Sequence, residues 1–226
     1  MANKITFIYD YKDGETWSTP MSLVNEFKKR NWEVDIIKTN DTDLKNWIDS
    51  KPQTDIVVFV HTNSDRIPTA NEEIGTIDHS NPGQNEAGRA IQLYYKYIHD
   101  PQFLQWAQQQ WFKEINTRWA HLKTIHFHCF PDSVKHSHLL PGMVFTTPLI
   151  HISIGELSGT DKEIDKLILE DQRYNHLSAA NNQILADIIL RSIYKYRPGQ
   201  YRLDLNEFQL VNPNSVKFPL KGYGTI

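Results

Sequence analysis

Four histidines that could bind a metal or carry a proton lie close together near the middle of the chain. They are His126, His128, His136 and His138, and the single cysteine, Cys129, lies among them. Residues 124–130 form an apolar run that predicts a strand, so His126 and His128 should point to one face. Imidazole and thiolate are ligands that zinc prefers, although the spacing matches no closed zinc motif. The pattern leaves open a metal site and a polar strand face.

A further histidine precedes the last predicted helix, residues 177–194. His176 is followed by Leu177 and Ser178, and a serine at this point can cap the helix. A histidine here would lie over the carboxyl edge of a parallel sheet, where α/β proteins bind their ligands. Its residue type is compatible with a catalytic role and with a capping or packing role.

A polar stretch without clear periodicity covers residues 62–84. A loop of this length in a compact domain often has a function of its own. Its side chains suit binding to sugar hydroxyls or to a protein partner, and a solvated loop is the alternative. The polar residues include Asn63, Ser64, Asp65, Arg66, Glu72, Glu73, Asp78 and His79.

The elements that must position these groups alternate between strand and helix. Strands are predicted at residues 4–9, 33–38, 55–61 and 124–130, with a short fifth strand at 149–154. Helices are predicted at residues 19–30, with Thr19 as N-cap, and at 41–48, 86–98, 101–122, 161–169 and 177–194. This alternation predicts an α/β fold, a three-layer αβα sandwich with a parallel sheet.

Composition excludes several classes of function. The 226 residues carry a formal net charge of -3 without a long basic run, which argues against nucleic acid as a partner. No segment approaches the ~20 apolar residues that span a membrane. One cysteine allows no internal disulfide, and glycine-rich phosphate loops are absent. We therefore expect a soluble cytoplasmic protein without a cofactor.

The last helical segment resembles the terminal block of the SGNH/GDSL hydrolases, in which a histidine opens the final helix. The matching residues are His176, Leu177, Ser178, Asn181, Leu185 and Ala186. The run KITFIYD stands where this family has its first strand, ending in Gly-Asp-Ser, and DIVVFVHTNSDR stands at its strand before Gly-x-Asn-Asp. The likeness covers roughly residues 4–195, is nearest to members carried by tailed phages, and implies a flavodoxin-like sheet.

The chain departs from the family at its reactive positions. Tyr11 stands at the position of the nucleophilic serine, after Asp10, and Arg173 stands where the family has the aspartate before its histidine. The resemblance therefore implies a pseudoenzyme, a binding or structural module that has lost its nucleophile. Its implied binding residues are Tyr11, Asn63, Ser64, Asp65, Arg66 and Arg173.

An active ester hydrolase is the alternative that the resemblance leaves open. His176 would be its base, Asp10 and Asp171 would be further catalytic carboxylates, and Ser18 would be a displaced nucleophile. A carbohydrate acetyl ester is the substrate that the family implies. A metal-dependent site at the four clustered histidines is the third hypothesis.

The tail after Arg197 has a different pattern, with prolines, glycines and isolated apolar residues. We expect a domain at residues 1–196 and an extended arm at 197–226. The arm would either wrap its own domain or hold a protein partner, including a second copy of the chain. If the chain is encoded by a phage, its location would be the host cytoplasm or the virion.

Overall fold

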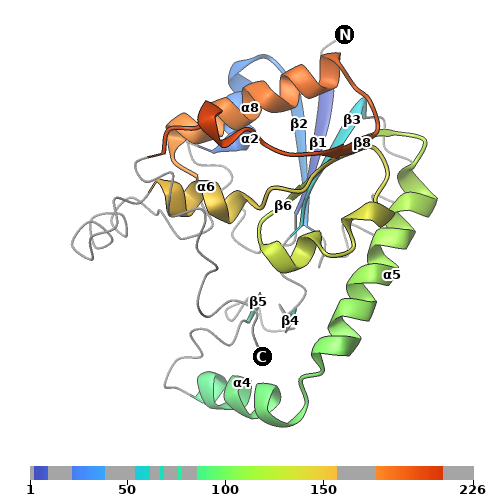
Figure 1. Ribbon diagram of the computed structural model, residues 1–226, viewed down its shortest axis with the longest axis vertical. Helices are drawn as coiled ribbons and strands as arrows, with labels where there is room; N and C mark the ends of the chain where they lie inside the picture. The colour runs from blue at the N-terminus through green and yellow to red at the C-terminus, as the bar shows by residue number, and fades with distance from the viewer. Residues whose placement is uncertain are drawn as a thin grey trace.

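A six-stranded parallel sheet forms the centre of the computed structural model, which describes residues 3–9, 22–38, 54–61, 67–68, 76–77, 86–156 and 177–210 (Figure 1). The strand order is β2-β1-β3-β6-β7-β8. The strands are β1 (Lys4–Tyr9), β2 (Glu33–Lys38), β3 (Ile56–His61), β6 (Lys123–His128), β7 (Met143–Phe145) and β8 (Gly199–Tyr201). Every neighbouring pair is parallel, so the predicted α/β fold with a flavodoxin-like order is confirmed.

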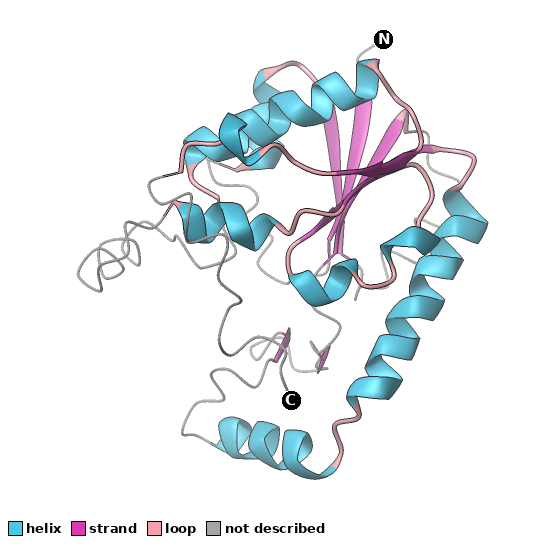
Figure 2. Cartoon of the chain, in the orientation of Figure 1, coloured by secondary structure: helices cyan, strands magenta, loops and turns pink. Residues whose placement is uncertain are grey.

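Helices cover both faces of this sheet, as Figure 2 shows. On one face lie α2 (Leu23–Lys29), α6 (Leu149–Gly155) and α8 (Ala179–Tyr194), which contribute to the larger apolar core. On the other face, α5 (Pro101–Trp119) packs over a smaller core. The remaining elements are α4 (Glu86–Tyr97), β4 (Ile67–Pro68), β5 (Thr76–Ile77), η1 (Pro131–Val134), η2 (Ser137–Leu139) and η3 (Leu205–Glu207).

Only the second half of α5 is anchored in the core. Phe112, Ile115 and Trp119 recur at helical spacing and are buried against the sheet. The first half extends past the sheet toward α4, and there Phe103 and Trp106 are exposed (Figure 1). The helix therefore shields one face of the sheet with its C-terminal turns.

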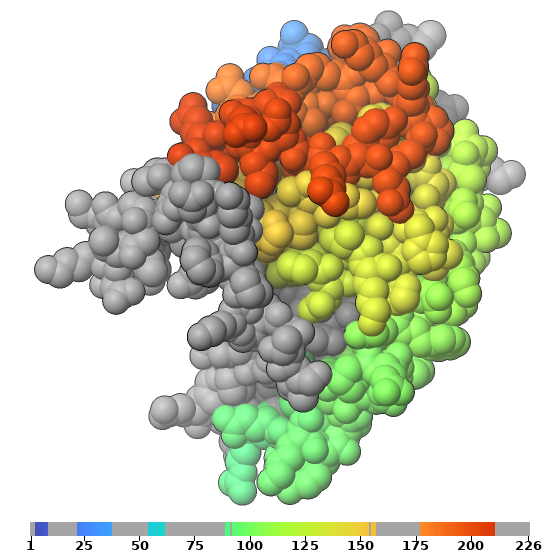
Figure 3. All heavy atoms as spheres, viewed as in Figure 1, coloured from blue at the N-terminus to red at the C-terminus, as the bar shows by residue number. Residues whose placement is uncertain are grey.

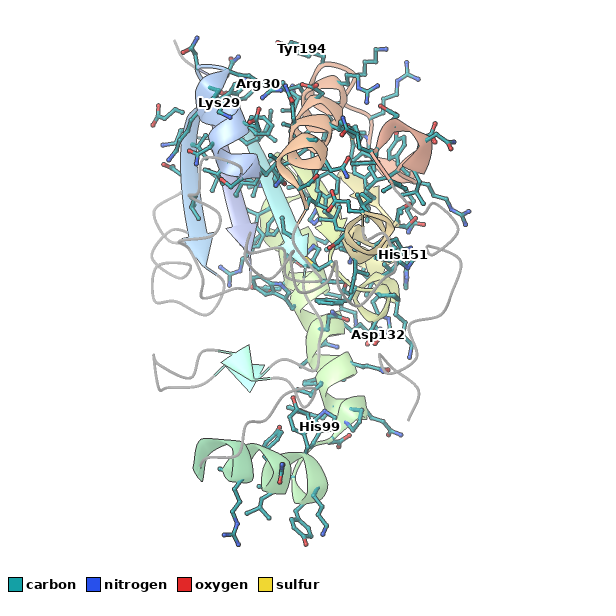
Figure 4. The ribbon with its side chains drawn as sticks, turned by 90° about the vertical axis from the view of Figure 1, so that its left-hand side faces the viewer. Lys29, Arg30, His99, Asp132, His151 and Tyr194 are labelled. Atoms are coloured by element: carbon teal, nitrogen blue, oxygen red, sulfur yellow. The ribbon has the colours of Figure 1, made fainter. Side chains whose placement is uncertain are left out.

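An ion-pair network joins α2 to α8, and Figure 4 shows Arg30 between these helices. The Arg30 guanidinium lies 2.7 Å from Glu26 Oε2 and 2.8 Å from Asp187 Oδ1. Burial opposes ionisation of Glu26, but hydrogen bonds from Lys29 and Arg30 outweigh it and lower the pKa of this carboxyl group. The ion pairs of Arg30 with Glu26 and Asp187 thus hold α2 and α8 together over β1.

Two local predictions are corrected by the structure. The N-cap of α2 is Ser22, whose Oγ accepts a hydrogen bond from Asn25 N at 3.3 Å, and not Thr19. Residues 149–154 form a helix, α6, instead of a strand, and β7 is the strand at this place in the sheet. A short apolar run fits a buried strand and a buried helix equally well, so its periodicity does not separate the two.

Gly142 lets the chain enter β7 directly beside β6. Its φ is +71°, and a Cβ at this position would lie 2.2 Å from the Thr124 carbonyl oxygen. Its own carbonyl accepts a hydrogen bond from Gly199 N at 2.8 Å, which starts the pairing with β8. A residue with a side chain would be strained here and would also clash with the backbone of β6.

Part of the predicted arm belongs to the packed domain. β8 is an edge strand of the sheet, and Leu203 and Phe208 beyond it are buried in the larger core. Residues 199–210 therefore wrap their own domain, which is one of the two roles that the sequence leaves open.

Residues 211–226 and the predicted helices at 41–48 and 161–169 lie outside the described residues. No helix in the described ranges has the length and apolar character that a membrane span requires.

Candidate functional site

Two neighbouring strands bring three histidines together at the carboxyl edge of the sheet. β3 ends at His61 and β6 ends at His128, and the parallel register pairs these two residues. His126 is two residues earlier on β6 and is paired with Phe59. Alternation along the strands directs all three imidazoles to the face that α5 covers.

The three rings form a contiguous cluster, here called the histidine cluster. His61 Nε2 lies 3.0 Å from His126 Nδ1, and the two ring planes are within 4° of each other. The ring centroids of His61 and His128 are 5.1 Å apart. His126 and His128 are fully buried and His61 is 7% exposed, so the cluster is part of the interior.

Aromatic side chains enclose the histidine cluster. The Phe59 ring stacks on His126 with the centroids 4.8 Å apart, and it is parallel to His61 as well. From α5, the Phe112 ring approaches His61 to 4.8 Å between centroids. The histidines thus have an apolar surrounding that disfavours any charged form.

Hydrogen bonds assign the proton of His128. The Ser133 hydroxyl donates to the Phe130 carbonyl oxygen at 2.7 Å, so its oxygen is left to accept from His128 Nδ1 at 3.1 Å. His128 Nε2 then carries a lone pair, and it has no hydrogen-bond partner among the described residues. The buried ring thus keeps an unused proton acceptor.

The histidine cluster is neutral at pH 7. Burial lowers the pKa of His128 to about 3. Burial, followed by the mutual effect of the neighbouring rings, lowers the pKa of His61 and His126 well below the ordinary value. The backbone carbonyl of Pro141 acts in the opposite direction on the pKa of His126 and partly offsets this lowering.

The four-histidine metal site is not formed. His126 and His128 lie in the interior, whereas His138 is exposed and contacts His136 at a ring distance of 6.4 Å near η2. Cys129 is buried in the core on the opposite face of the sheet. In the chain segments that the structure describes, no three His, Cys, Asp or Glu side chains are arranged to hold a metal ion.

The contact between Ser133 and His128 does not make a nucleophile. In an activated serine the imidazole accepts the hydroxyl proton, whereas here the hydroxyl donates to a backbone carbonyl and the ring donates to the hydroxyl. Ser133 is also fully buried. A substrate therefore does not reach this oxygen.

A second group of hydrogen-bonded polar residues holds the beginning of α8, just after His176 in the sequence. Ser178 is the N-cap, as predicted, and its Oγ accepts from Asn181 N at 3.3 Å. The Glu156 carboxylate accepts from Ser178 N at 3.0 Å, from Ser178 Oγ at 2.7 Å, and from Asn181 Nδ2. Burial raises the pKa of Glu156, and these hydrogen bonds oppose the rise.

The other predicted site residues lie outside the described parts of the chain. They are Asp10, Tyr11, Ser18, Asn63, Ser64, Asp65, Arg66, Asp171, Arg173 and His176. The sequence reasoning missed His61 and Glu156. His61 could have been found from the pairing of two apolar strands that both end in histidine, whereas no local pattern distinguishes Glu156 from other carboxylates.

The chain matches no protein-family model, no curated protein and no solved structure. Its function is therefore inferred from its own residues and their geometry.

Proposed function

We propose that the chain is an SGNH-hydrolase-like domain that has lost its serine nucleophile and acts as a binding or structural module. This proposal rests on the identity of the residues that follow β1. Its pairing with β2 extends to Tyr9, so the next two residues in the sequence are Asp10 and Tyr11. In the family that the chain resembles, the residue at the position of Tyr11 is the serine nucleophile.

The described part of the carboxyl edge supports the same conclusion. Its imidazoles are buried and neutral, and His61 and His126 are hydrogen-bonded to each other. Among the described residues, the Ser133 hydroxyl contacts an imidazole, but it is buried. It donates its proton to a backbone carbonyl and not to the ring, so the ring does not activate it as a nucleophile. Removing one member of a catalytic triad leaves only a small residual rate, so the loss of the serine would leave little acyl transfer.

The flavodoxin-like strand order and the capped start of α8 further support a relationship with these hydrolases. On this proposal a carbohydrate ester remains the ligand class that the resemblance implies, and the position next to His176 is the place to look for it. By the same resemblance we propose a phage-associated protein of the host cytoplasm or the virion.

The test is hydrolysis of p-nitrophenyl acetate by the wild type, His176→Ala and Ser18→Ala. His138→Ala, which alters an exposed histidine, is the matched control. We expect all four proteins to give the same rate as the buffer background. A fluorophosphonate probe, which labels activated serines, should leave Ser18 unmodified.

Activity in the wild type and the control that is lost in both His176→Ala and Ser18→Ala would overturn the proposal. That result would establish the alternative, an ester hydrolase with a displaced nucleophile. Calorimetric titration of the wild type with an acetylated oligosaccharide, with acetate release measured in the same sample, separates binding from turnover.

A further inference from the structure

A surface groove of about 930 Å³ lies between the C-terminal half of α8 and the segment that follows it. We call it the α8–β8 groove. It is bounded by residues of α8, by the turn at 195–197, by Tyr201 of β8 and by residues 202–207. Figure 1 shows these segments in orange to red, and in Figure 3 their atoms face the viewer.

The groove carries a surplus of positive charge. Arg191 forms an ion pair with Glu207, whereas Lys195, Arg197 and Arg202 are exposed and form no ion pair with another described residue. This surplus belongs to a chain whose overall net charge is -3. The cations are thus concentrated locally, in the pattern of a site that attracts an anionic ligand.

Aromatic and apolar surface lies beside these cations. Tyr194 is 80% exposed and lines the groove together with Tyr201. Figure 4 shows Tyr194 at the end of α8. Met143 and Phe145 of β7 and Leu203 lie beneath the groove and are only 5–6% exposed. The surface that a ligand can reach therefore combines positive charge with tyrosine rings.

Hydrogen bonds hold the lining in place. Tyr201 Oη donates to the Arg197 carbonyl oxygen at 2.8 Å, which fixes the turn after α8. Thr124 N donates to the Tyr196 hydroxyl oxygen at 3.1 Å, which ties the same turn to β6. Leu203 N donates to Thr147 Oγ1 at 3.0 Å on the far side of the groove. The shape is therefore built by contacts with the sheet before any ligand arrives.

Two carboxylates, Asp204 and Glu207, lie among the cations. They partly offset the four cations, so the groove attracts a densely charged chain such as a nucleic acid or a polyglutamate segment less strongly than the cations alone would. Glu207 is paired with Arg191, and Asp204 Oδ1 accepts from Asn206 N and Nδ2. Asp204 Oδ2 is the carboxylate oxygen that can accept a hydrogen bond from a ligand hydroxyl group. Sugar rings offer hydroxyls together with apolar faces that stack on tyrosine, and uronate carboxylates pair with arginine in the bidentate geometry.

We propose that the α8–β8 groove binds a uronate-containing oligosaccharide. Arg197 and Arg202 hold its carboxylates, Tyr194 stacks on a sugar ring, and Asp204 accepts from ring hydroxyls. This site goes beyond the proposed function, because Arg197, Arg202, Tyr194 and Asp204 are not among the residues that the resemblance implies for the ester site. Its ligand binding is therefore independent of whether the chain hydrolyses an ester.

The test is calorimetric titration of the full chain with tetragalacturonate at low salt, beside the methyl-esterified tetramer, which lacks the charge. We expect binding of the acid form, and binding at least about tenfold weaker, a loss of about 1.4 kcal/mol, for the methyl ester and for Arg197→Gln/Arg202→Gln, because each change removes the pairing of carboxylate with guanidinium. Tyr194→Ala should weaken both forms, because stacking does not depend on charge.

The control is Arg89→Gln/Lys113→Gln, which removes two exposed cations from α4 and α5 and should bind as the wild type does. An octathymidylate and an octaglutamate peptide are titrated in parallel. The proposal is wrong if tetragalacturonate does not bind at millimolar concentration, if both double variants lose affinity equally, or if either of these other polyanions binds more tightly. His176→Ala should bind tetragalacturonate as the wild type does.

Discussion

The histidine cluster is an unusual use of three titratable side chains. Each imidazole is neutral in the fold because Phe59, Phe112 and the neighbouring rings exclude water. In the unfolded chain the same rings have an ordinary pKa near 6.5 and accept protons below it. The cluster therefore couples the stability of the protein to pH.

We predict that the free energy of unfolding falls as pH is lowered from 7.5 to 5.5. When the folded state lowers the pKa of a histidine, that histidine does not change the free energy of unfolding at pH values above its pKa in the unfolded chain. As the pH falls from there toward its pKa in the folded protein, the unfolded chain binds a proton that the fold does not, and the free energy of unfolding decreases. Each histidine lowers the free energy of unfolding by about 1.4 kcal/mol per pH unit below 6.5. The three together therefore lower it by about 4 kcal/mol at pH 5.5. Urea unfolding followed by tryptophan fluorescence at the two pH values measures this difference.

His126→Phe should remove about one third of this pH dependence, because one desolvated imidazole is lost. His138→Gln, at an exposed ring outside the histidine cluster, is the control variant. The burial-raised pKa of Glu156 acts with the opposite sign, so the same comparison in a Glu156→Gln background isolates the histidines. Equal stability of the wild type at both pH values would contradict this account.

The sequence alone predicted that His126 and His128 share a face of a strand, and this is confirmed. It did not predict that they are buried or that His61 joins them. Local alternation states which side chains of one strand share a face, but the neighbouring strand is chosen by the packing of the whole sheet.

At the scale of single elements, the start of α8 depends on a residue that directly follows another helix. Glu156 follows α6, yet its carboxylate accepts hydrogen bonds from three donors at the first turn of α8, which are Ser178 N, Ser178 Oγ and Asn181 Nδ2. Asn181 in turn exchanges hydrogen bonds with Gln209, at 2.8 and 3.0 Å. The cap therefore connects α6, α8 and the end of the described chain.

Glu156→Ala should destabilise the protein by about 2–4 kcal/mol, because it leaves donors of the half-buried Ser178 and the buried Asn181 without an acceptor. Glu156→Gln should cost only about 1 kcal/mol, since the amide keeps one oxygen acceptor. Urea unfolding at pH 7.5 measures both, and amide hydrogen exchange in the first turn of α8 locates the loss.

The matched control for this pair is Glu114→Ala, at an exposed carboxylate that pairs with Arg118 on α5. Exposed pairs contribute at most about 1 kcal/mol, so this variant should remain close to the wild type. A Glu156→Ala protein as stable as the Glu114→Ala protein would rule out the proposed role of the cap.

Strand and helix bounds were predictable where periodicity is long or where a cap has a clear residue type. The strands at residues 4–9 and 33–38 and the cap at Ser178 agree with the structure. The predicted strand at residues 149–154 does not agree, because the apolar side chains of this segment are buried as well by a helix packed on the sheet as they would be by a strand. The difference between the two lies in contacts, not in composition.

At the scale of the whole molecule, the chain returns to the sheet after its last helix. β8 adds to the edge beside β7, and Thr146 N donates to the Tyr201 carbonyl oxygen at 2.9 Å. Leu203 and Phe208 then enter the core under α8. The described tail is thus a structural part of the domain, and it also forms one wall of the α8–β8 groove.

A chain that ends at Tyr196 should be less stable than one that ends at Leu210. The shorter chain loses β8 and the burial of Leu203 and Phe208, which together contribute about 3–6 kcal/mol. Its melting temperature should be roughly 10–20 °C lower for a protein of this size. Circular dichroism during heating measures both chains, and equal melting temperatures would show that residues 197–210 do not stabilise the domain.

The sequence by itself determined the alternation of strands and helices, the parallel α/β class and the absence of serine at position 11, because each is a local property of the chain. The tertiary structure alone decided that His61 meets His126, that Glu156 caps α8, and that residues 199–201 complete the sheet. These pairs are brought together by long-range packing, and periodicity within one segment holds no information about which distant segment it will contact.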